Sequence, residues 1–258
     1  MGTATRRRAV RILTAAAVLA LPLTAQGLGP ETREVIEAFV ARGAGARVAD
    51  LIIEQDVTLY NPDNSLQHVR WHERQVIKLP RRHRVEKLMD GQREIRLVVG
   101  DRAWVRRRDG RTYEAPAGHA EGHRSHLLVP QRGTAEDLLR AWRALGIRDD
   151  RGHMTRVRGR AVAVIGARPE DRESPAVWMD ADYGVVRFLT RETLPAGPAL
   201  VDRVFSEHRP LVAGFFFPHR QEVFVGGKLL MLVAVGSVVV NTDPSDDLFD
   251  PARLRRAR

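Results

Sequence analysis

The hydrophobic and polar positions of the chain follow two different periods, and the helical period appears first. Between residues 31 and 42, Val35, Ile36, Phe39 and Val40 recur at the spacing of one helix face. The run "GAGA" that follows predicts the end of this helix. The segment is therefore expected to form an amphipathic helix with an apolar stripe.

A second amphipathic helix is predicted in the segment "TAEDLLRAWRALGI". Thr134 is placed to cap its N-terminus, with Asp137 three residues later to complete a capping box. Leu138, Trp142 and Leu145 share one face before a glycine ends the helix.

Most of the remaining chain alternates between apolar and polar residues, which is the period of a half-buried strand. Ile53, Gln55, Val57 and Leu59 share one side of such a strand, and "DG" pairs at 90–91 and 109–110 predict hairpin turns. The pattern lacks the βαβ rhythm of a parallel sheet. We predict a mainly β (α+β) single domain. Its architecture is a strongly curved antiparallel sheet, an incomplete β-barrel of about 10–11 strands, with a helical lid.

The first 27 residues have the order of a secretory signal peptide. A positive segment with four arginines precedes a short apolar run at 12–23, and small residues follow at 25–27. The run is shorter than the roughly 20 apolar residues of a membrane helix. Cleavage near Gly27 removes those four arginines and no acid, which lowers the formal net charge from +10 to +6.

These features predict a cleaved signal peptide at 1–27, a mature domain at 28–252 and a basic tail at 253–258. The chain contains no cysteine, so neither a disulfide nor a Cys-ligated metal is expected. A bacterial lipoprotein is acylated on a cysteine just after its signal, and none stands there. We expect a periplasmic protein that is not itself lipid-anchored.

Motifs for catalysis or metal binding give little support to an enzyme. His119, His123 and His126 stand in a Gly- and Ser-containing run, which favours a solvated loop over a three-His zinc site. The acidic segment Asp243–Pro251 lacks the spacing and the terminal Glu of a calcium loop. Neither G-x-S-x-G nor a phosphate-binding glycine loop occurs. The sequence predicts no catalysis, no cofactor and no metal.

The segment Ile95–Pro116 carries six arginines. Successive residues of a strand point to opposite faces, so Arg106, Arg107 and Arg108 are not expected to form one patch. Aromatic residues do not interleave with the basic ones as a single-strand nucleic-acid binder requires. We expect these arginines to solvate a sheet surface, aided by attraction to anionic lipid, and we expect no nucleic-acid partner.

A large curled sheet with two short helices favours an apolar concavity that side chains leave unfilled. The expected lipid-binding lining is Ile53, Val57, Leu59, Ile77, Val85, Ile95, Leu97, Val99, Trp104, Trp178, Val186, Phe188, Phe215, Phe217 and Phe224. Phe39, Leu138 and Trp142 are expected on the lid. An ordinary place in a filled core is the alternative for each residue.

Five segments, in order, resemble the LolA/LolB superfamily of periplasmic lipoprotein carriers and sorting proteins. They are "VIKLPRRHRVEK", "VVGDRAWVRRRDGRTYE", "VWMDADYGVVRFLTRE", "AGFFFPHRQEVF" and "VVVNTDPSDDLFDP". The resemblance spans roughly residues 30 to 252. It implies an incomplete antiparallel barrel capped by helices, which holds acyl chains of a lipid or lipoprotein in an apolar cavity without catalysis or nucleotide.

One position departs from the family pattern. The classical carriers place an Arg directly before the proline, where it tethers the lid, whereas this chain has Leu79 there, flanked by Lys78 and Arg81. The departure puts lid control by that arginine in doubt.

The function that the resemblance implies is a carrier with transient membrane contact. It would take acyl chains from an inner-membrane donor complex and deliver them to an outer-membrane acceptor. One alternative is an RseB/MucB-like lipid-sensing regulatory module on the same fold, and another is a plain β-sandwich with a filled interior. The sensors carry a second C-terminal domain, and this chain ends soon after Phe249, which favours the carrier.

Overall fold

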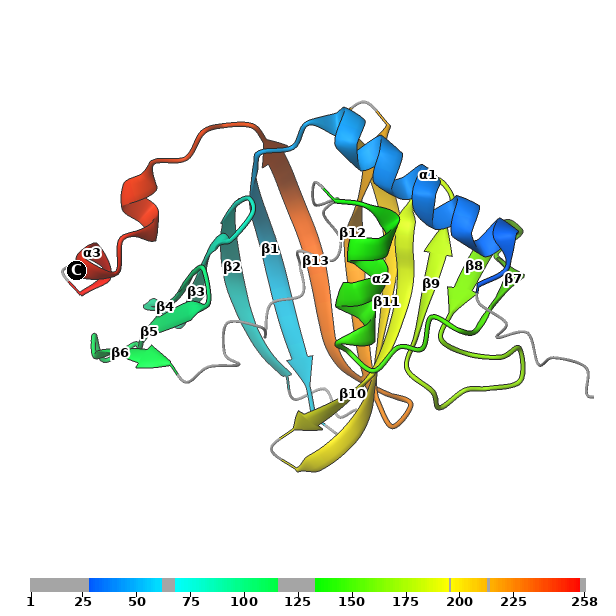
Figure 1. Ribbon diagram of the computed structural model, residues 1–258. Helices are drawn as coiled ribbons and strands as arrows, with labels where there is room; N and C mark the ends of the chain where they lie inside the picture. Colours follow the sequence, from blue (N-terminus) through cyan, green and yellow to red (C-terminus); the bar gives the residue numbers. More distant parts are fainter. Residues whose placement is uncertain (1–27, 62–67, 116–132, 195, 213, 256–258) are drawn as a thin grey trace, which may run out of the picture.

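The computed structural model describes residues 28–61, 68–115, 133–194, 196–212 and 214–255 (Figure 1). The expected signal peptide, the three histidines of the 118–126 segment and the last three residues of the expected basic tail lie outside these ranges. Within them, thirteen strands form one antiparallel sheet in the order β6-β5-β4-β3-β2-β1-β13-β12-β11-β10-β9-β8-β7. The sheet is not closed into a barrel.

Two meanders build this sheet. The first runs through β1 (Asp50–Tyr60), β2 (His68–Lys78), β3 (Arg82–Met89), β4 (Gln92–Val99), β5 (Arg102–Arg106) and β6 (Thr112–Ala115). The second runs through β7 (Gly152–Val157), β8 (Arg160–Ile165), β9 (Ala176–Asp180), β10 (Gly184–Leu194), β11 (Gly197–Val212), β12 (Phe215–Val225) and β13 (Lys228–Val240). Because β1 pairs with β13, the meanders join into a single sheet.

The prediction of a mainly β, single antiparallel sheet with helices is confirmed, and the strand number is higher than expected. The additional strands include β7, where "GHMTRV" alternates too weakly to be recognised. A tight turn joins β7 to β8, with Arg158 (φ 50°) and Gly159 (φ 82°) both in the left-handed region. Such turns twist with the strands they connect, so the chain reverses without splaying the pair.

The first helix, α1 (Pro30–Ala46), is longer than predicted. The "GAGA" run was expected to end it, but Gly43 and Ala46 are buried and the helix continues through them. Packing therefore outweighs the low helix propensity of glycine. The helix ends at Arg47, whose φ of 48° gives the left-handed C-cap conformation.

The second helix, α2 (Ala135–Arg143), begins at the predicted capping box. The backbone N–H of Asp137 donates to Thr134 Oγ1 at 3.1 Å, and the backbone N–H of Thr134 donates to Asp137 Oδ2 at 2.9 Å. Two of the orphan donors at the start of the helix are thus satisfied.

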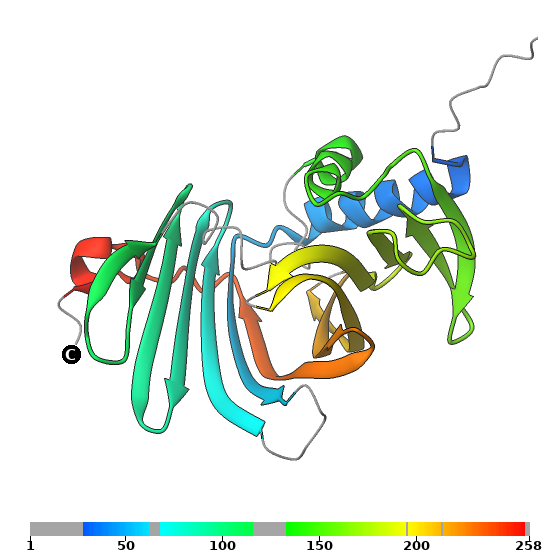
Figure 2. The ribbon, with the colours of Figure 1, turned by 90° about the horizontal axis from the view of Figure 1, so that it is seen from below.

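Helices cover both faces of the sheet, but at different places (Figure 2). Helices α1 and α2 pack on one face over β7–β12, which we call the front face. The C-terminal elements η2 (Asp246–Phe249) and α3 (Pro251–Leu254) pack on the opposite, back face, over β2–β5. Of the helices in the described ranges, none has the length and apolarity of a membrane span.

The C-terminal segment is held to the sheet by charge and by apolar contact. Lys78 Nζ lies 2.9 Å from carboxylate oxygens of both Asp243 and Asp246. Phe249 and Leu254 are buried against Val76 and its neighbours on the back face. The acids weighed above as a calcium loop are thus partnered by a cation of the sheet, and α3 continues the packed domain through Leu254.

Candidate functional site

The front face under the helices is a dry apolar cluster. Trp142 and Leu139 of α2 and Ile36 and Phe39 of α1 pack against the sheet. Their sheet partners are Ala163, Ile165, Val177, Met179, Val185, Phe188 and Phe205. Exposed fractions here range from 0 to 8 %, so the helices remove this part of the sheet from water almost completely.

A second apolar cluster continues the front face beyond the end of α1. Ala46 and Val48 approach the sheet there. They contact Leu51 and Ile53 of β1, Ile77 of β2, and Phe215 and Phe217 of β12. The front face thus carries apolar surface on both sides of the β1–β13 junction.

A small enclosed cavity lies beside this second cluster. Its walls are Ile53, Gln55, Gln75, Phe217, Pro218, Gln221, Val233 and Val235, and its volume is about 30 Å³. That is about the volume of one water molecule. Pockets that bind small organic ligands have roughly ten times this volume or more. The cavity as it stands admits a water but not an alkyl chain.

A buried polar cluster separates the apolar front face from the strands β3–β6. Glu73 is 7 % exposed and accepts hydrogen bonds from three neutral donors. These are the side-chain amides of Gln55 (2.8 Å) and Gln75 (2.7 Å) and the indole of Trp71 (3.2 Å). His83 extends the cluster by a 3.1 Å hydrogen bond to Gln75. The alternation of apolar and polar residues predicts that Gln55 is on the buried side of its strand. The buried carboxylate of Glu73 was not predicted, because a glutamate in a strand usually faces solvent.

A second cluster of polar side chains lies on the front face, on β10 and β11. Arg203 donates to both carboxylate oxygens of Glu192, at 2.6 and 3.0 Å, and the hydroxyl of Thr190 donates to the same carboxylate. Thr190 is 1 % exposed. The front face is therefore apolar at the helices and amphipathic elsewhere.

The structure distributes the fifteen expected lining residues over both faces of the sheet. Register places Ile53, Val57, Leu59, Ile77, Val85, Phe188, Phe215 and Phe217 on the front face. It places Ile95, Leu97, Val99, Trp104, Trp178 and Phe224 on the back face, and Val186 packs with the back-face cluster of Trp178. The second group cannot share a cavity with the first.

The physical reason is that alternation identifies a buried face but not what buries it. Ile95, Leu97 and Trp104 are buried by Phe249 and Leu254 of the C-terminal segment. Leu59, in contrast, is on the front face but 36 % exposed. One lining was expected, and the chain instead has separate apolar surfaces on the two sides of one sheet.

All three expected lid residues lie on the helices that contact the front face. Phe39 and Trp142 are 5 % and 1 % exposed, and Leu138 is partly buried. Leu139, at 1 % exposed, packs more deeply than Leu138 and was not predicted. The indole N–H of Trp142 is buried with no hydrogen-bond acceptor among the described residues. An unpaired buried donor is uncommon in folded proteins.

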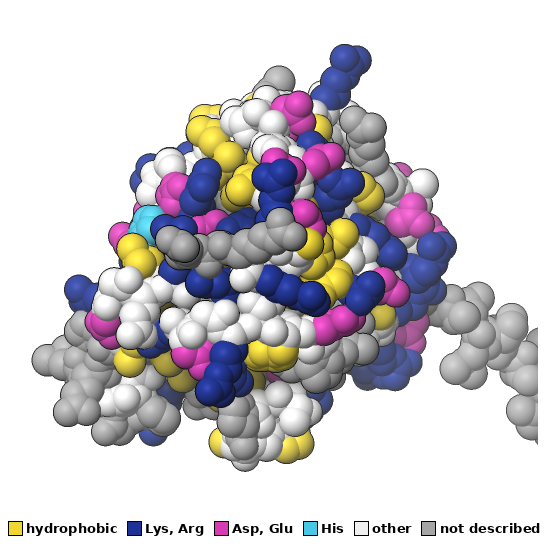
Figure 3. All heavy atoms as spheres, turned by 90° about the vertical axis from the view of Figure 1, so that its left-hand side faces the viewer, with side chains coloured by type: hydrophobic (Ala, Val, Ile, Leu, Met, Phe, Trp, Pro, Cys, Tyr) yellow, Lys and Arg dark blue, Asp and Glu magenta, His cyan; other side chains and the backbone are white. Residues whose placement is uncertain are grey.

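The arginine-rich segment differs from the expectation in one respect. Arg106 belongs to β5 and faces the back, but Arg107 and Arg108 both line one front-face hollow, together with Arg96. Strict alternation fails because β5 ends at Arg106 and the turn begins directly after it. At this end of the molecule, acidic side chains lie between the basic ones, so positive charge does not form a continuous stripe (Figure 3).

No group of three or more His, Cys, Asp or Glu residues within the described ranges is arranged to hold a metal ion. The three histidines weighed for zinc fall outside those ranges.

Comparisons with known proteins place the fold. No protein-family model matches the chain, and no curated protein matches it by sequence. Among solved structures, a domain assigned as an outer membrane lipoprotein-sorting protein from Vibrio parahaemolyticus has a TM-score of 0.55 and 13 % identity, over 87 % of this chain and 100 % of that one.

Two further structures agree with it. A DUF1329 family protein from Desulfovibrio piger has a TM-score of 0.57 and 10 % identity, over 86 % of this chain and 98 % of that one. A LolA superfamily protein from Nitrosomonas europaea has a TM-score of 0.51 and 9 % identity, over 83 % of this chain and 97 % of that one. Likeness at such low identity concerns the fold alone, and the conclusion is that this chain has a LolA-like fold.

Proposed function

We propose that the protein is a periplasmic carrier that binds acyl chains of a lipid or lipoprotein on its front face and transfers them between the inner and outer membranes without catalysis. The observation that carries the proposal is the apolar front face beneath α1 and α2 in a LolA-like fold. The expected inner-membrane donor, outer-membrane acceptor and transient membrane contact belong to the same proposal.

The closed arrangement of the helices sets a requirement on binding. The sheet surface beneath α1 and α2 is at most 8 % exposed, so α1 and α2 must move away from the sheet if a ligand is to cover that surface. The ligand then replaces the helices as the cover of Phe188, Val177 and their neighbours. The unpaired indole N–H of Trp142 would gain an acceptor if the ester or amide carbonyl of a ligand reached it.

The magnitudes favour reversible exchange. Burial contributes ~0.8 kcal/mol per methylene, so a sixteen-carbon chain gains on the order of 10 kcal/mol when fully dehydrated. Uncovering three large apolar side chains of the helices, Phe39, Leu139 and Trp142, costs on the order of 5 to 9 kcal/mol. The two quantities are of similar size. The cost of opening the lid therefore lowers the net free energy of ligand binding enough for release at an acceptor membrane without ATP.

The first test is whether the protein carries lipid. Protein purified without detergent is examined by native mass spectrometry, and its lipid extract is analysed separately. The expected result is a stoichiometric acyl species. Absence of any such species, together with failure to bind a fluorescent fatty-acid probe, would overturn the proposal.

A second test addresses movement of the lid. The chain contains no cysteine, so a single introduced thiol can be labelled cleanly. An environment-sensitive fluorophore at Leu138→Cys on α2 should change its emission when palmitate is added, because α2 leaves the sheet. The matched control is Leu248→Cys on η2, which also packs against an apolar cluster but on the back face. Equal changes at both positions would argue for general loosening and against a lid.

A further inference from the structure

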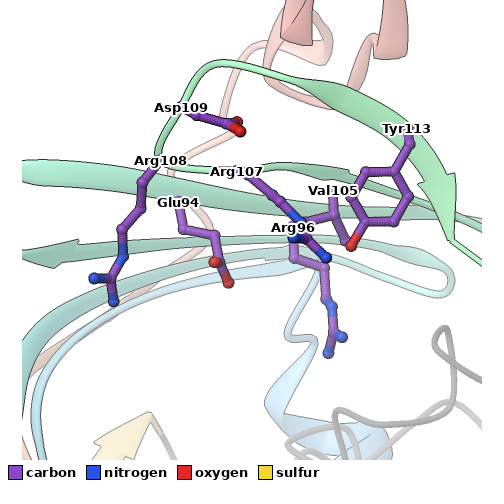
Figure 4. Close-up of a pocket in the computed structure, with 7 residues that line it drawn as sticks. All are labelled: Glu94, Arg96, Val105, Arg107, Arg108, Asp109 and Tyr113. Atoms are coloured by element: carbon purple, nitrogen blue, oxygen red, sulfur yellow. The ribbon is translucent and has the colours of Figure 1, made fainter.

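A hollow at the β4–β6 end of the front face combines basic side chains with an apolar floor (Figure 4). Its volume is about 390 Å³. Val105, 6 % exposed, forms the floor, and Glu94, Arg96, Arg107, Arg108, Asp109 and Tyr113 form the walls. The volume falls within the range of ligand pockets, roughly 300 to 1,000 Å³.

Strand register connects this hollow to the proposed acyl-binding surface. Ile53 pairs with Gln75, Gln75 with Val85, and Val85 with Arg96. Arg96 pairs in turn with Val105, and Val105 with Tyr113. Directly opposed residues of neighbouring strands point to the same side. One row of front-face side chains therefore runs from the apolar cluster of Ile53 to the hollow, over four strand spacings or about 19 Å.

The hollow is lined by three arginines and by two carboxylates, those of Glu94 and Asp109, so its formal charge is +1 and favours an anion. The carboxylate of Asp109 is engaged with Arg111 outside it: the backbone N–H of Arg111 donates to Asp109 Oδ1 at 2.9 Å, and Arg111 Nε lies 3.5 Å from Oδ2. Neither Arg107 nor Arg108 has an ion pair with a carboxylate of the described residues. The guanidinium of Arg107 lies over the ring of Tyr113, 5.3 Å from its centroid, and that of Arg108 contacts the sulfur of Met89 at 3.4 Å.

Other arginines of the same strands behave differently. Arg102 forms a bidentate pair with Glu114, with both N···O distances at 2.8 Å. Arg84 pairs with Glu86 at 2.6 Å. Both of these pairs face the back. Among the described residues, Arg107 and Arg108 thus form no ion pair, and the guanidinium fork of each matches the oxygens of a phosphate.

We propose that this hollow binds the anionic phosphate headgroup of an amphiphile whose acyl chains lie on the apolar front face. The inference rests on the proposed carrier function and narrows its ligand class to anionic, phosphate-bearing amphiphiles. The phosphate is held by Arg107 and Arg108, with Arg96 beside them. Val105 contacts the first part of the hydrocarbon. The chains continue toward Ile53 past Gln75, whose side-chain amide stays hydrogen-bonded to Glu73. Val85 and Ile53 are each 1 % exposed, so they contact the ligand only when the front face opens.

The test compares ligands that share one acyl chain. Binding of palmitoyl lysophosphatidic acid, palmitoyl lysophosphatidylcholine and dissolved inorganic phosphate is measured by titration calorimetry at fixed salt. Wild type should bind the anionic lipid about tenfold more tightly than the zwitterionic one, since charge-assisted hydrogen bonds of this kind contribute an affinity factor of about ten. The variant Arg107→Gln/Arg108→Gln should lose this preference and keep its affinity for lysophosphatidylcholine.

The matched control is Arg102→Gln, which removes one positive charge from the back face of the same strands, away from the hollow, so it should keep the preference. Equal affinity for the two lipids in wild type and in the double variant would overturn the headgroup site and leave the carrier proposal standing. Binding of inorganic phosphate that the double variant abolishes, with no lipid preference, would show a free-anion site and also overturn it. Failure of both lipids to bind wild type would overturn the carrier function itself.

Discussion

The front face has two regions that bury different kinds of side chain. Over β8–β10, Val177, Met179 and Phe188 are covered by α1 and α2, and the contact is apolar throughout. Over β1–β3, Gln55 and Glu73 are also buried, at 8 % and 7 % exposed, yet they are hydrogen-bonded polar groups. Both regions come from the same alternation of side chains along antiparallel strands.

Under the proposed carrier function, the two regions suit different parts of one ligand. An apolar helix can cover the first region and leave it again with little loss, because dispersion and burial are not directional. The second region contains hydrogen-bonded polar groups. If hydrocarbon displaced their hydrogen-bond partners, donors or acceptors would be left unpaired. A carrier of amphiphiles needs both kinds of surface, and they lie side by side on one face.

Truncating Trp142, the largest buried side chain of α2, should have the strongest effect on stability and on ligand retention. Trp142→Ala should lower the free energy of unfolding by about 3 to 5 kcal/mol, because a large buried side chain is lost and a cavity remains. It should also shorten retention of a fluorescent fatty acid, since the helix no longer closes the front face. Chemical denaturation and the dissociation rate of the probe measure the two effects.

The matched control is Phe249→Ala, which removes a buried aromatic residue, 4 % exposed, from the back face. It should destabilise the protein by a similar amount, about 3 to 5 kcal/mol, without shortening retention under conditions where both variants are folded. Equal loss of retention in the two variants would contradict the assignment of the front face as the binding surface.

Sequence alone predicted a considerable part of this architecture. The capping box of Thr134 and Asp137, the antiparallel alternation and the helical stripe of Ile36 and Phe39 each depend on local chemistry, and each is present. The division of apolar residues between two faces could not be predicted locally. It depends on Phe249 reaching Trp104 from far along the chain.

A buried histidine on the helix-covered half gives the next effect, which depends on pH. The ring of His208 stacks on Tyr183 at 4.7 Å, and its Nε2 is buried without a partner among the described residues. Burial lowers the pKa of His208 to about 4; the charge of Asp180 opposes this shift and that of Arg160 adds to it. The buried nitrogen of His208 thus lacks hydrogen bonds within the described ranges, whereas the buried carboxylate of Glu73 accepts three.

The unfolded chain, with an ordinary histidine pKa near 6.5, binds a proton before the folded chain does as the pH falls. Stability is therefore fully present above about pH 6.5, falls between 6.5 and about 4, and this contribution is lost below about 4. The full loss is on the order of 3 kcal/mol. His208→Phe should flatten this part of the stability profile relative to wild type, which denaturant titrations at successive pH values can detect. Parallel profiles would contradict the prediction.

A smaller effect is expected in the polar region. Glu73→Gln keeps the shape of the side chain but sets an amide NH₂ group against a donor in either orientation. Gln55 and Gln75 donate at the Oε1 position, and Trp71 donates at the Oε2 position. The free energy of unfolding should fall by about 2 kcal/mol, because buried donors lose their charged acceptor. The control is Glu54→Gln on the back face, where the carboxylate is 34 % exposed and should contribute much less. If Glu54→Gln lowered the free energy of unfolding as much as Glu73→Gln, the prediction that the buried polar cluster contributes more than an exposed carboxylate would be wrong.

The smallest expected effect separates local opening of the lid from global stability. Thr134→Ala removes the N-cap of α2 and should destabilise that helix by about 1 kcal/mol. Hydrogen exchange of the α2 amides should accelerate about fivefold, because α2 can open without unfolding the sheet. Asp250→Ala removes the corresponding cap of α3, where Asp250 Oδ1 accepts from the Ala252 N–H at 2.8 Å. Because Leu254 ties α3 into the back-face core, that variant should leave α2 exchange unchanged. Faster exchange throughout the sheet in Thr134→Ala would mean that α2 is an inseparable part of the core, and a lid that opens independently would then be excluded.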